Sequence, residues 1–493
     1  MQGILSWRIL AKLLTSYISF YFAFESTQRN RRNEIDANHA KTAGFGSKRP
    51  TKFGLIRSNI RPDADKPAPA APIKQRNFVV NRQRLLERFL EFVKVDTTAN
   101  PDADCYPSSE GQRDLGAVVA AHLKACGLQD VQQDEFALVS ATIPSNLSAA
   151  CPVVALNAHL DTSPETTGAG VNPQVIEKYA GGDIPLTGDT SKTITVSDCP
   201  ELKDLVGKTL VTTDGTTLLG GDDKAGVAII VELAAFLMEN PEIRHGDIRV
   251  LFTCDEEIGR GVDKVNMDEL AADVCYTLDG PGANAIDVET FSADEATVTF
   301  TGINIHPAIA KDRMVNAIRA AGSFLDRLPR ESLAPESTDG RDGFLHPYRI
   351  LDGQVDKVVL KVLLRDFDTP RLEEHAELLR KTAAEIGELC PGCEIDVVVK
   401  QQYRNLGEGL AKEPRAVEFA SRAFERLDRT PATNIIRGGT DGSRLTELGL
   451  PTPNLSSGQH NIHSPLEFAC LDEMVQAVEV LVELVQVWAE AKA

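Results

Sequence analysis

Three short, largely apolar runs, each followed closely by an ionisable side chain, constrain the fold of this chain more than any other feature. Short runs of four or five mostly apolar residues are typical of strands that are buried on both faces of a sheet. The runs and the side chains that follow them are residues 153–156 before His159, 248–252 before Asp255, and 275–278 before Asp279. The sequence therefore predicts buried strands that end in polar side chains.

Helical patterns accompany these strands. Apolar residues recur at helical spacing over residues 85–93, which predicts an opening amphipathic helix over 81–95, and residues 226–238 and 471–489 are later helical stretches. Strands that alternate with helices indicate an α/β fold, and sheets of this kind bind ligands beyond the carboxyl ends of their strands. We therefore expect the chemistry at the strand ends.

The pattern changes after residue 295. Segments of strand and helix character indicate a smaller α+β unit inserted into the first domain, and they lie at residues 296–301, 355–364, 373–389 and 394–399. We predict a main domain in two parts, 80–295 and 403–493, interrupted by the inserted unit, 296–402.

Residues 1–79 differ from the rest of the chain in charge. They carry 14 Lys and Arg residues against 5 Asp and Glu residues, whereas the whole chain has a net charge of −20. An uncharged run at residues 13–24 is short for a membrane span but suits the core of a signal peptide. Three interpretations of this basic head stay open: an export signal or anchor, a disordered extension, or a start codon placed too far upstream.

The composition restricts partner and compartment. The strongly negative net charge argues against binding to nucleic acid, because phosphate affinity depends on Lys and Arg. The nine scattered cysteines favour a reducing, cytoplasmic location, with export or anchoring as the alternative if the head is a signal. The close pair Cys390 and Cys393 is more typical of a turn between a helix and a strand than of a metal site.

Two motifs near the predicted strands admit two interpretations each. His159 and Asp161 lie on one side of an extended backbone, and a carboxylate commonly holds the second nitrogen of a metal-bound imidazole. The segment GGDDKAG, residues 220–226, places Asp222 and Asp223 between glycines directly before a helix. Taken alone, the first motif is compatible with a structural pair and the second with an acidic helix cap.

Three further signals are equally ambiguous when taken alone. Glu256 and Glu257 point to opposite sides of a strand, so they converge on one site only if the strand has already turned. A solvated acidic loop is the alternative there, and a simple turn is the alternative at Asp279. His463 lies in a polar loop, with His460 as a competitor three residues away.

Together these residues supply what a two-metal hydrolase requires. Each metal needs a histidine or carboxylate of its own and a share of a bridging aspartate, and an unbound glutamate must accept the proton of the attacking water. Nitrogen and oxygen ligands of this kind suit zinc. The chain holds the complete set, so a zinc-dependent hydrolase is expected.

The order of the motifs resembles peptidase T, the tripeptide aminopeptidase family of the di-zinc exopeptidase group that includes carboxypeptidase G and aminoacylase. The likeness runs from about residue 80 to the C-terminus. The segments that carry it are AHLDTSPE (158–165), NPQVIEKYAGGDI (172–184), LLGGDDKAG (218–226), CDEEIGRG (254–261), YTLDG (276–280), NIHPAIAKD (304–312), LLRDFD (363–368), IRGGTDG (436–442) and the late His463.

Matched motif by motif, the resemblance implies five metal ligands: His159, Asp222, Glu257, Asp279 and His463. Asp222 matches the bridging ligand because the pattern of the group is Asp-x-Lys, and the peptide bond after this residue is typically cis in the group. Asp161 matches the residue that orients His159, and Glu256 matches the general base.

The resemblance also implies substrate-binding residues in and near the inserted unit, which would then be a lid or dimerisation domain. His306 matches a histidine that stabilises the oxyanion. Arg365 and Arg437 lie in motifs associated with substrate binding and are expected to grip a carboxylate.

The implied function is a di-zinc aminopeptidase that releases the N-terminal residue from tripeptides. A dipeptidase, a carboxypeptidase or an amide deacylase of the same group is the alternative, because the metal chemistry is indifferent to which end of the substrate is free. The expected cofactor is Zn²⁺, two ions per subunit. The expected partners are short peptides with a free amino terminus, with no nucleic acid and no stable membrane span, and with a homodimer through the lid as the expected mode of assembly.

Overall fold

The computed structural model describes residues 79–491. The predicted basic head, residues 1–79, lies outside this range except for Val79. Among the described residues, no helix is long and apolar enough to cross a membrane.

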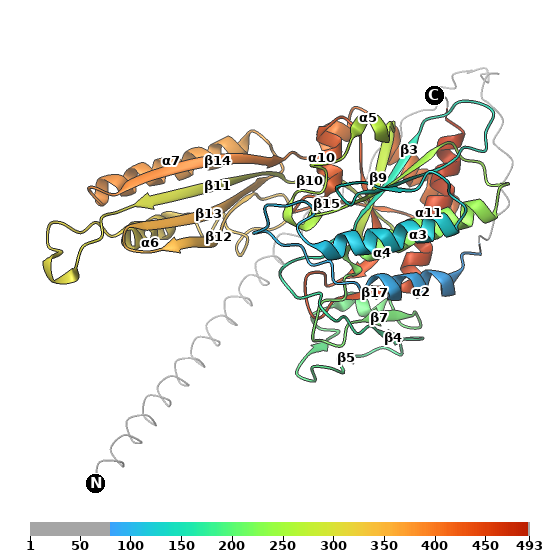
Figure 1. The fold of residues 1–493 in the computed structure, drawn as a ribbon, viewed down its shortest axis with the longest axis horizontal. Helices are drawn as coiled ribbons and strands as arrows, with labels where there is room; N and C mark the ends of the chain where they lie inside the picture. Colours follow the sequence, from blue (N-terminus) through green and yellow to red (C-terminus); the bar gives the residue numbers. More distant parts are fainter. Residues whose placement is uncertain (1–78, 492–493) are drawn as a thin grey trace, which may run out of the picture. The chain divides into compact units, whose positions relative to one another are not determined.

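The larger sheet has 11 strands and contains the buried strands predicted from the sequence (Figure 1). At its centre β3 (Val154–His159) pairs in parallel with β8 (Ile248–Thr253) on one side and with β9 (Val274–Pro281) on the other. The remaining strands are β1 (Gln132–Gln133), β2 (Val139–Ile143), β4 (Gln174–Ile176), β7 (Leu210–Thr212), β10 (Ala285–Thr290), β15 (Ala432–Ile436), β16 (Asn454–His460) and β17 (Phe468–Cys470).

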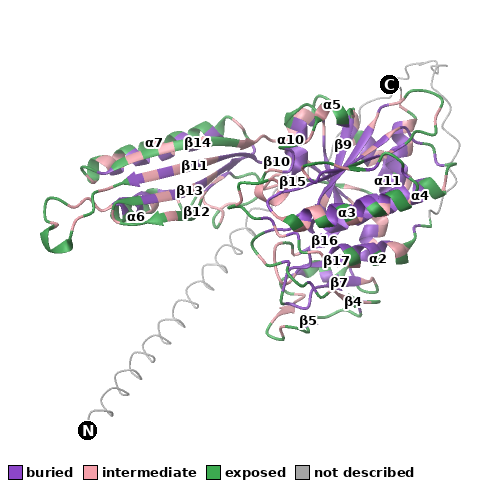
Figure 2. Cartoon of the chain, viewed as in Figure 1, coloured by how far each residue is buried: buried purple, intermediate pink, exposed green. Residues whose placement is uncertain are grey.

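Helices pack on both faces of this sheet, which explains why its central strands are mostly apolar. Val154 and Leu156 of β3 enter one core, whereas Ala155 between them enters the other, because successive strand residues point to opposite faces. The helices of the first core are α2 (Arg82–Phe92), α3 (Glu110–Ala125), α4 (Gly221–Glu239), α9 (Arg415–Arg426) and α11 (Leu471–Ala489). Those of the second core are α5 (Met267–Leu270) and α10 (Asp441–Glu447), and Figure 2 shows the strands between the two layers as buried.

A second, antiparallel sheet of four strands follows β10, in the order β12-β13-β11-β14. Its strands are β11 (Ser292–Thr301), β12 (Phe344–Gly353), β13 (Lys357–Asp366) and β14 (Glu394–Tyr403). The helices α6 (Ala317–Arg327) and α7 (Arg371–Leu389) pack on it and enclose a hydrophobic core of its own. The α/β class with an inserted sheet-rich unit is therefore confirmed, while the exact domain limits at 295 and 402 stay predictions.

Short elements complete the chain. They are β5 (Ile184–Pro185), β6 (Thr193–Ile194), α8 (Gly407–Leu410) and the 3-10 helices η1 (Pro200–Lys203), η2 (Glu256–Ile258) and η3 (Pro307–Ile309). Cys390 and Cys393 are free thiols in the turn between α7 and β14, where the N–H of Cys393 donates to the carbonyl of Cys390 at 3.0 Å. The prediction of a turn at this pair is confirmed.

Candidate metal centre

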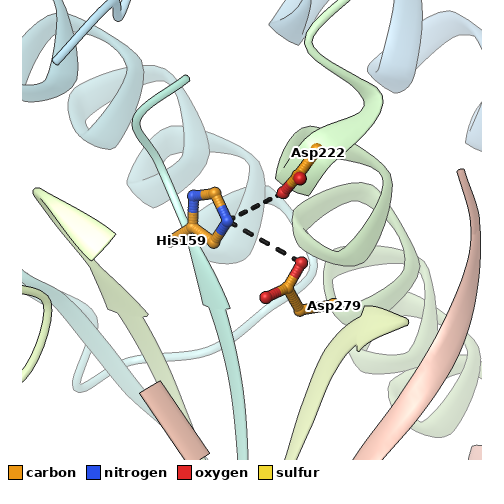
Figure 3. Close-up of side chains that lie close together, drawn as sticks. All are labelled: His159, Asp222 and Asp279. Carbon is orange, nitrogen blue, oxygen red and sulfur yellow. Dashed lines mark hydrogen bonds and ion pairs between the residues drawn. The ribbon is translucent and has the colours of Figure 1, made fainter. Parts of the chain in front are cut away.

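The first cluster of candidate ligands forms where β3 and β9 end. His159 is the last residue of β3, Asp279 lies near the end of the neighbouring β9, and Asp222 lies in the first turn of α4. His159 Nε2 is 3.0 Å from Asp222 Oδ1 and 3.8 Å from Asp279 Oδ1 (Figure 3). The expectation that polar side chains meet at the strand ends therefore holds for this pair of parallel strands.

A second cluster shares Asp222 with the first. His463 Nε2 lies 3.3 Å from Asp222 Oδ2 and 3.0 Å from Glu257 Oε2. One oxygen of Asp222 thus faces His159 and the other faces His463. In each cluster the three ligand atoms all lie within 4.8 Å of one another, so one ion could contact all three.

Of the two aspartates at the start of α4, Asp222 joins these clusters and Asp223 does not. Gly220 has a positive φ of 78°, and the peptide bond between Asp222 and Asp223 is cis, as predicted. The side chain of Asp223 turns elsewhere: its Oδ2 accepts a hydrogen bond from the N–H of His159 at 3.3 Å and its Oδ1 accepts one from the N–H of Gly226.

The glutamate pair lies beyond a turn, as its convergence requires. Strand β8 ends at Thr253, and Asp255 adopts a left-handed φ of 62°. The carboxylate of Asp255 is buried and accepts hydrogen bonds from the backbone N–H of Ser108 and from Gln112 Nε2, which hold this conformation. Glu257 then reaches the second cluster.

Asp161 connects the first histidine with both glutamates. Its Oδ1 lies 3.5 Å from His159 Nδ1, which is also 3.2 Å from the carbonyl oxygen of Asp161. Its two carboxylate oxygens accept the N–H groups of Glu256 and Glu257 at 3.0 Å each. Glu256 stands apart from the candidate ligand clusters, with its Oε2 4.0 Å from His159 Nε2.

The electrostatics of the second cluster show an excess of negative charge. Burial raises the pKa of Glu257 to about 7, and the charge of Asp222 adds to this shift. Burial opposes protonation of His463, but its hydrogen bonds to Asp222 and Glu257 raise its pKa to about 12. The carboxylates therefore favour positive charge at this place.

The donor set fits two divalent cations. Glu257 Oε1 is buried and has no hydrogen-bond partner among the described residues, although a buried oxygen of this kind normally has one. Each cluster combines imidazole nitrogen with carboxylate oxygen, a mixture that suits zinc and related ions. A cation would satisfy the unpaired oxygen and balance the clustered carboxylates.

Three predicted residues are not part of these clusters. His306 is exposed, and its Nδ1 accepts a hydrogen bond from the N–H of Ala308 in η3. Arg365 Nη1 donates to the carbonyls of Asp294 and Leu364. Arg437 is held by residues 338–342, because its guanidinium donates to the carbonyls of Gly340 and Asp342 and to Thr338 Oγ1. Their roles toward a substrate stay predictions.

Sequence reasoning missed two carboxylates of this region. Glu165 Oε2 lies 3.2 Å from His463 Nδ1, and Glu467 accepts hydrogen bonds from the loop that carries Asp222. Glu165 lies only four residues beyond the His-x-Asp motif, but nothing in the local pattern indicates its partner 298 positions later. His460, the competitor of His463, instead pairs with Glu473 at 2.7 Å.

Comparison with known proteins gives the family. The sequence profile of peptidase family M20/M25/M40 matches residues 220–487, more than half of the chain. Peptidase T of Geobacillus thermodenitrificans is 42% identical over 407 residues, which are 83% of this chain and 98% of that protein. This chain belongs to peptidase family M20/M25/M40. The resemblance to peptidase T is confirmed.

Solved structures share the M20 fold. A tripeptidase from Staphylococcus aureus superposes with a TM-score of 0.66 at 23% identity and covers 84% of this chain and 100% of its own. A dinuclear metal-binding M20 peptidase from Bacillus subtilis gives a TM-score of 0.56 at 16% identity and covers 83% of this chain and 98% of its own. Their shared fold agrees with the two-sheet arrangement described above.

Proposed function

We propose that this M20 peptidase is an aminopeptidase that releases the N-terminal residue of tripeptides with two zinc ions as cofactor. The observation that carries the proposal is the pair of ligand clusters joined through the two oxygens of Asp222. A bridging carboxylate of this kind is what a two-metal hydrolase requires. The similarity to peptidase T supplies the substrate class.

The ligands divide between two cation sites. His159, Asp222 and Asp279 would hold one ion, and Asp222, Glu257 and His463 would hold the other. When bound, the ions polarise the peptide carbonyl and lower the pKa of the attacking water towards about 7. The side chains around them provide the remaining steps.

Glu256 is the residue that moves the proton. It lies beside the first cluster, with its Oε2 4.0 Å from His159 Nε2, and it is not one of the candidate ligands. Its carboxylate accepts the proton of the attacking water and then gives it to the departing amine. Asp161 holds the backbone of Glu256 and orients His159, so one carboxylate aligns both groups.

The proposed substrate contacts lie in the inserted unit, except for Arg437, which follows β15 of the larger sheet. His306 would stabilise the oxyanion, and Arg365 and Arg437 would bind the carboxylate of a short peptide. Arg437 already donates three hydrogen bonds to residues 338–342, so binding of a carboxylate there would require some of these to be exchanged. A cytoplasmic location and a homodimer through the lid belong to the same proposal.

A substrate panel tests the proposal. The zinc-loaded protein is incubated with a free tripeptide, its N-acetylated form and its C-terminal amide, and the products are identified by mass spectrometry. We expect release of the first residue from the free tripeptide and no cleavage of the acetylated form. Hydrolysis of the acetylated peptide from its carboxyl end, or removal of the acetyl group, would instead support a carboxypeptidase or a deacylase.

A further inference from the structure

Glu467 is a buried carboxylate that belongs to neither ligand cluster, yet it contacts the loop of the shared ligand. Its side chain lies on the segment that supplies His463, and the residue is only 1% exposed. Its Oε2 accepts the backbone N–H groups of Leu219 at 2.8 Å and Gly220 at 2.9 Å, and its Oε1 accepts the N–H of Asp222 at 3.1 Å. Both oxygens are therefore used on one short loop.

Glu467 is a common acceptor for N–H groups of this loop, residues 219–222. The N–H groups in the first turn of a helix have no partner within the helix, so those at the start of α4 need an outside acceptor. The chain also fits closely around the carboxylate: a Cβ atom on Gly221 would lie 3.2 Å from Glu467 Oε1. Small displacements of this loop would move the Asp222 carboxylate away from both histidines.

We propose that Glu467 is a positioning residue for the bridging ligand Asp222, and that residues 463–467 thereby act on both cation sites. His463 supplies a ligand to one site directly. Glu467, four residues later, fixes the backbone of the carboxylate that the two sites share. The inference rests on the proposed two-metal function, because it assigns Glu467 a role in holding the cations.

Glutamine at position 467 tests this role with almost no change in shape. The amide nitrogen of Gln cannot accept a hydrogen bond, so Glu467→Gln loses one or two of the three bonds and turns a donor towards another donor. We expect an affinity for Zn²⁺ about 10- to 100-fold weaker, the range typical when partners of metal ligands are removed. Competition with a chromogenic chelator measures this affinity, and the visible spectrum of the Co²⁺-loaded protein reports the ligand geometry.

Glu473→Gln is the matched control. Glu473 is similarly buried, at 6% exposed, and pairs with His460 and Lys208 instead of with the Asp222 loop. We expect this variant to keep the wild-type affinity for Zn²⁺ and the wild-type Co²⁺ spectrum. An equal loss in both variants would assign the effect to general destabilisation and would overturn the inference, as would wild-type metal affinity in Glu467→Gln.

Two further readouts keep the test decisive. If Glu467→Gln does not fold, Gly221→Ala crowds the same carboxylate while its charge remains, and we expect weaker Zn²⁺ binding than in the wild type. Unchanged binding in that variant would contradict the proposal. Failure of the proposed function looks different, because the wild-type protein itself would then bind no zinc or hydrolyse no peptide.

Discussion

The two main sheets differ in how their charged side chains are paired. On the second sheet, Asp366 pairs with His375 Nε2 at 3.1 Å and with Arg371 at 3.4 Å, and Glu295 pairs with Lys361 at 2.6 Å. At the strand ends of the first sheet, by contrast, carboxylates gather around two histidines and one carboxylate oxygen has no partner. On the second sheet the carboxylates have cationic side chains as partners, whereas the carboxylates at the strand ends of the first sheet lack enough cationic partners and suit bound cations.

The pKa shifts point the same way. Burial opposes ionisation of Asp366, but the hydrogen bond from His375 and the charge of Arg371 lower its pKa below the usual range. For Asp279, burial and the negative charge of Asp222 both raise the pKa well above the usual range. Strongly shifted pKa values of several carboxylates in one place are common at functional sites.

Removal of metal is expected to give the largest effect and to act on one sheet only. Treatment with a chelator should reduce peptide hydrolysis to background, because the clustered carboxylates lose their counter-charge when the metal is removed. Added Zn²⁺ should restore hydrolysis. Hydrogen exchange measured by mass spectrometry should rise in the peptides that contain residues 219–224 and 255–260.

The second sheet provides the internal control for this experiment. Exchange in β13 should stay unchanged after chelation, since its ion pairs do not depend on a cation. Equal deprotection of both sheets would contradict the comparison and would mean that the metal supports the whole fold.

Substitution of the two glutamates should separate proton transfer from metal binding. Glu256→Gln keeps its shape but cannot accept a proton, so we expect kcat to fall by about 100- to 10,000-fold while bound zinc stays at the wild-type level. Glu257→Gln should instead lower the zinc content, because Glu257 lies in the second ligand cluster. Steady-state kinetics and elemental analysis of the same samples measure both quantities, and the reverse pattern would show that the roles are exchanged.

Removal of a charge from the second sheet should affect stability and not metal. We expect Asp366→Asn to lower the free energy of unfolding of the inserted unit by about 1–3 kcal/mol at pH 7. The reason is that the buried His375 and the N–H of Asp368 both contact the Asp366 carboxylate, and an amide replaces one of its two acceptor oxygens by a donor. The pKa of Asp366 is lower in the folded state, so its contribution is present above about pH 4, its unfolded pKa, and is lost as the pH falls below that value.

Denaturant unfolding at several pH values checks this expectation. The difference between Asp366→Asn and the wild type should narrow below about pH 4, and the zinc content of the two proteins should be equal at pH 7. A variant that loses zinc would show that the second sheet is coupled to the metal centre more closely than its internal ion pairs suggest.

Features encoded in short stretches of sequence could be predicted. The apolar runs before His159 and Asp279 indicated buried strands, and parallel strands bring their carboxyl ends to one edge. The last helix, Leu471–Ala489, is found with the bounds that its periodicity predicts. The choice of Asp222 over Asp223 came from the family pattern, because the local sequence offers two adjacent aspartates and does not distinguish between them.

Residues that act on a distant backbone could not be predicted. Glu467 accepts N–H groups about 245 positions earlier in the chain. The carboxylate of Asp255 is held by Ser108, which precedes α3, and by Gln112 in the first turn of α3. Such contacts follow from tertiary packing, so they leave no periodicity or local spacing to read. Arg437 shows the opposite problem, because its motif suggested a substrate contact while its side chain donates to neighbouring carbonyls.

Removal of residues 1–78 is expected to have the smallest effect. The residues of the two ligand clusters and the ion pairs of the second sheet all lie after residue 79. A chain that begins at Val79 should therefore keep the kcat/KM of the full chain within about twofold and the same zinc content.

Helix α2 must remain, because Arg82 pairs with Asp472 of α11, and Arg84 and Arg88 both pair with the buried Glu232 of α4. A longer deletion through Phe92 would leave the Glu232 carboxylate buried without these partners, which is strongly destabilising. We therefore expect the longer deletion to be insoluble and the shorter one to be active, as measured by expression, zinc analysis and tripeptide hydrolysis. Loss of activity in the chain that begins at Val79 would assign part of the function to the basic head.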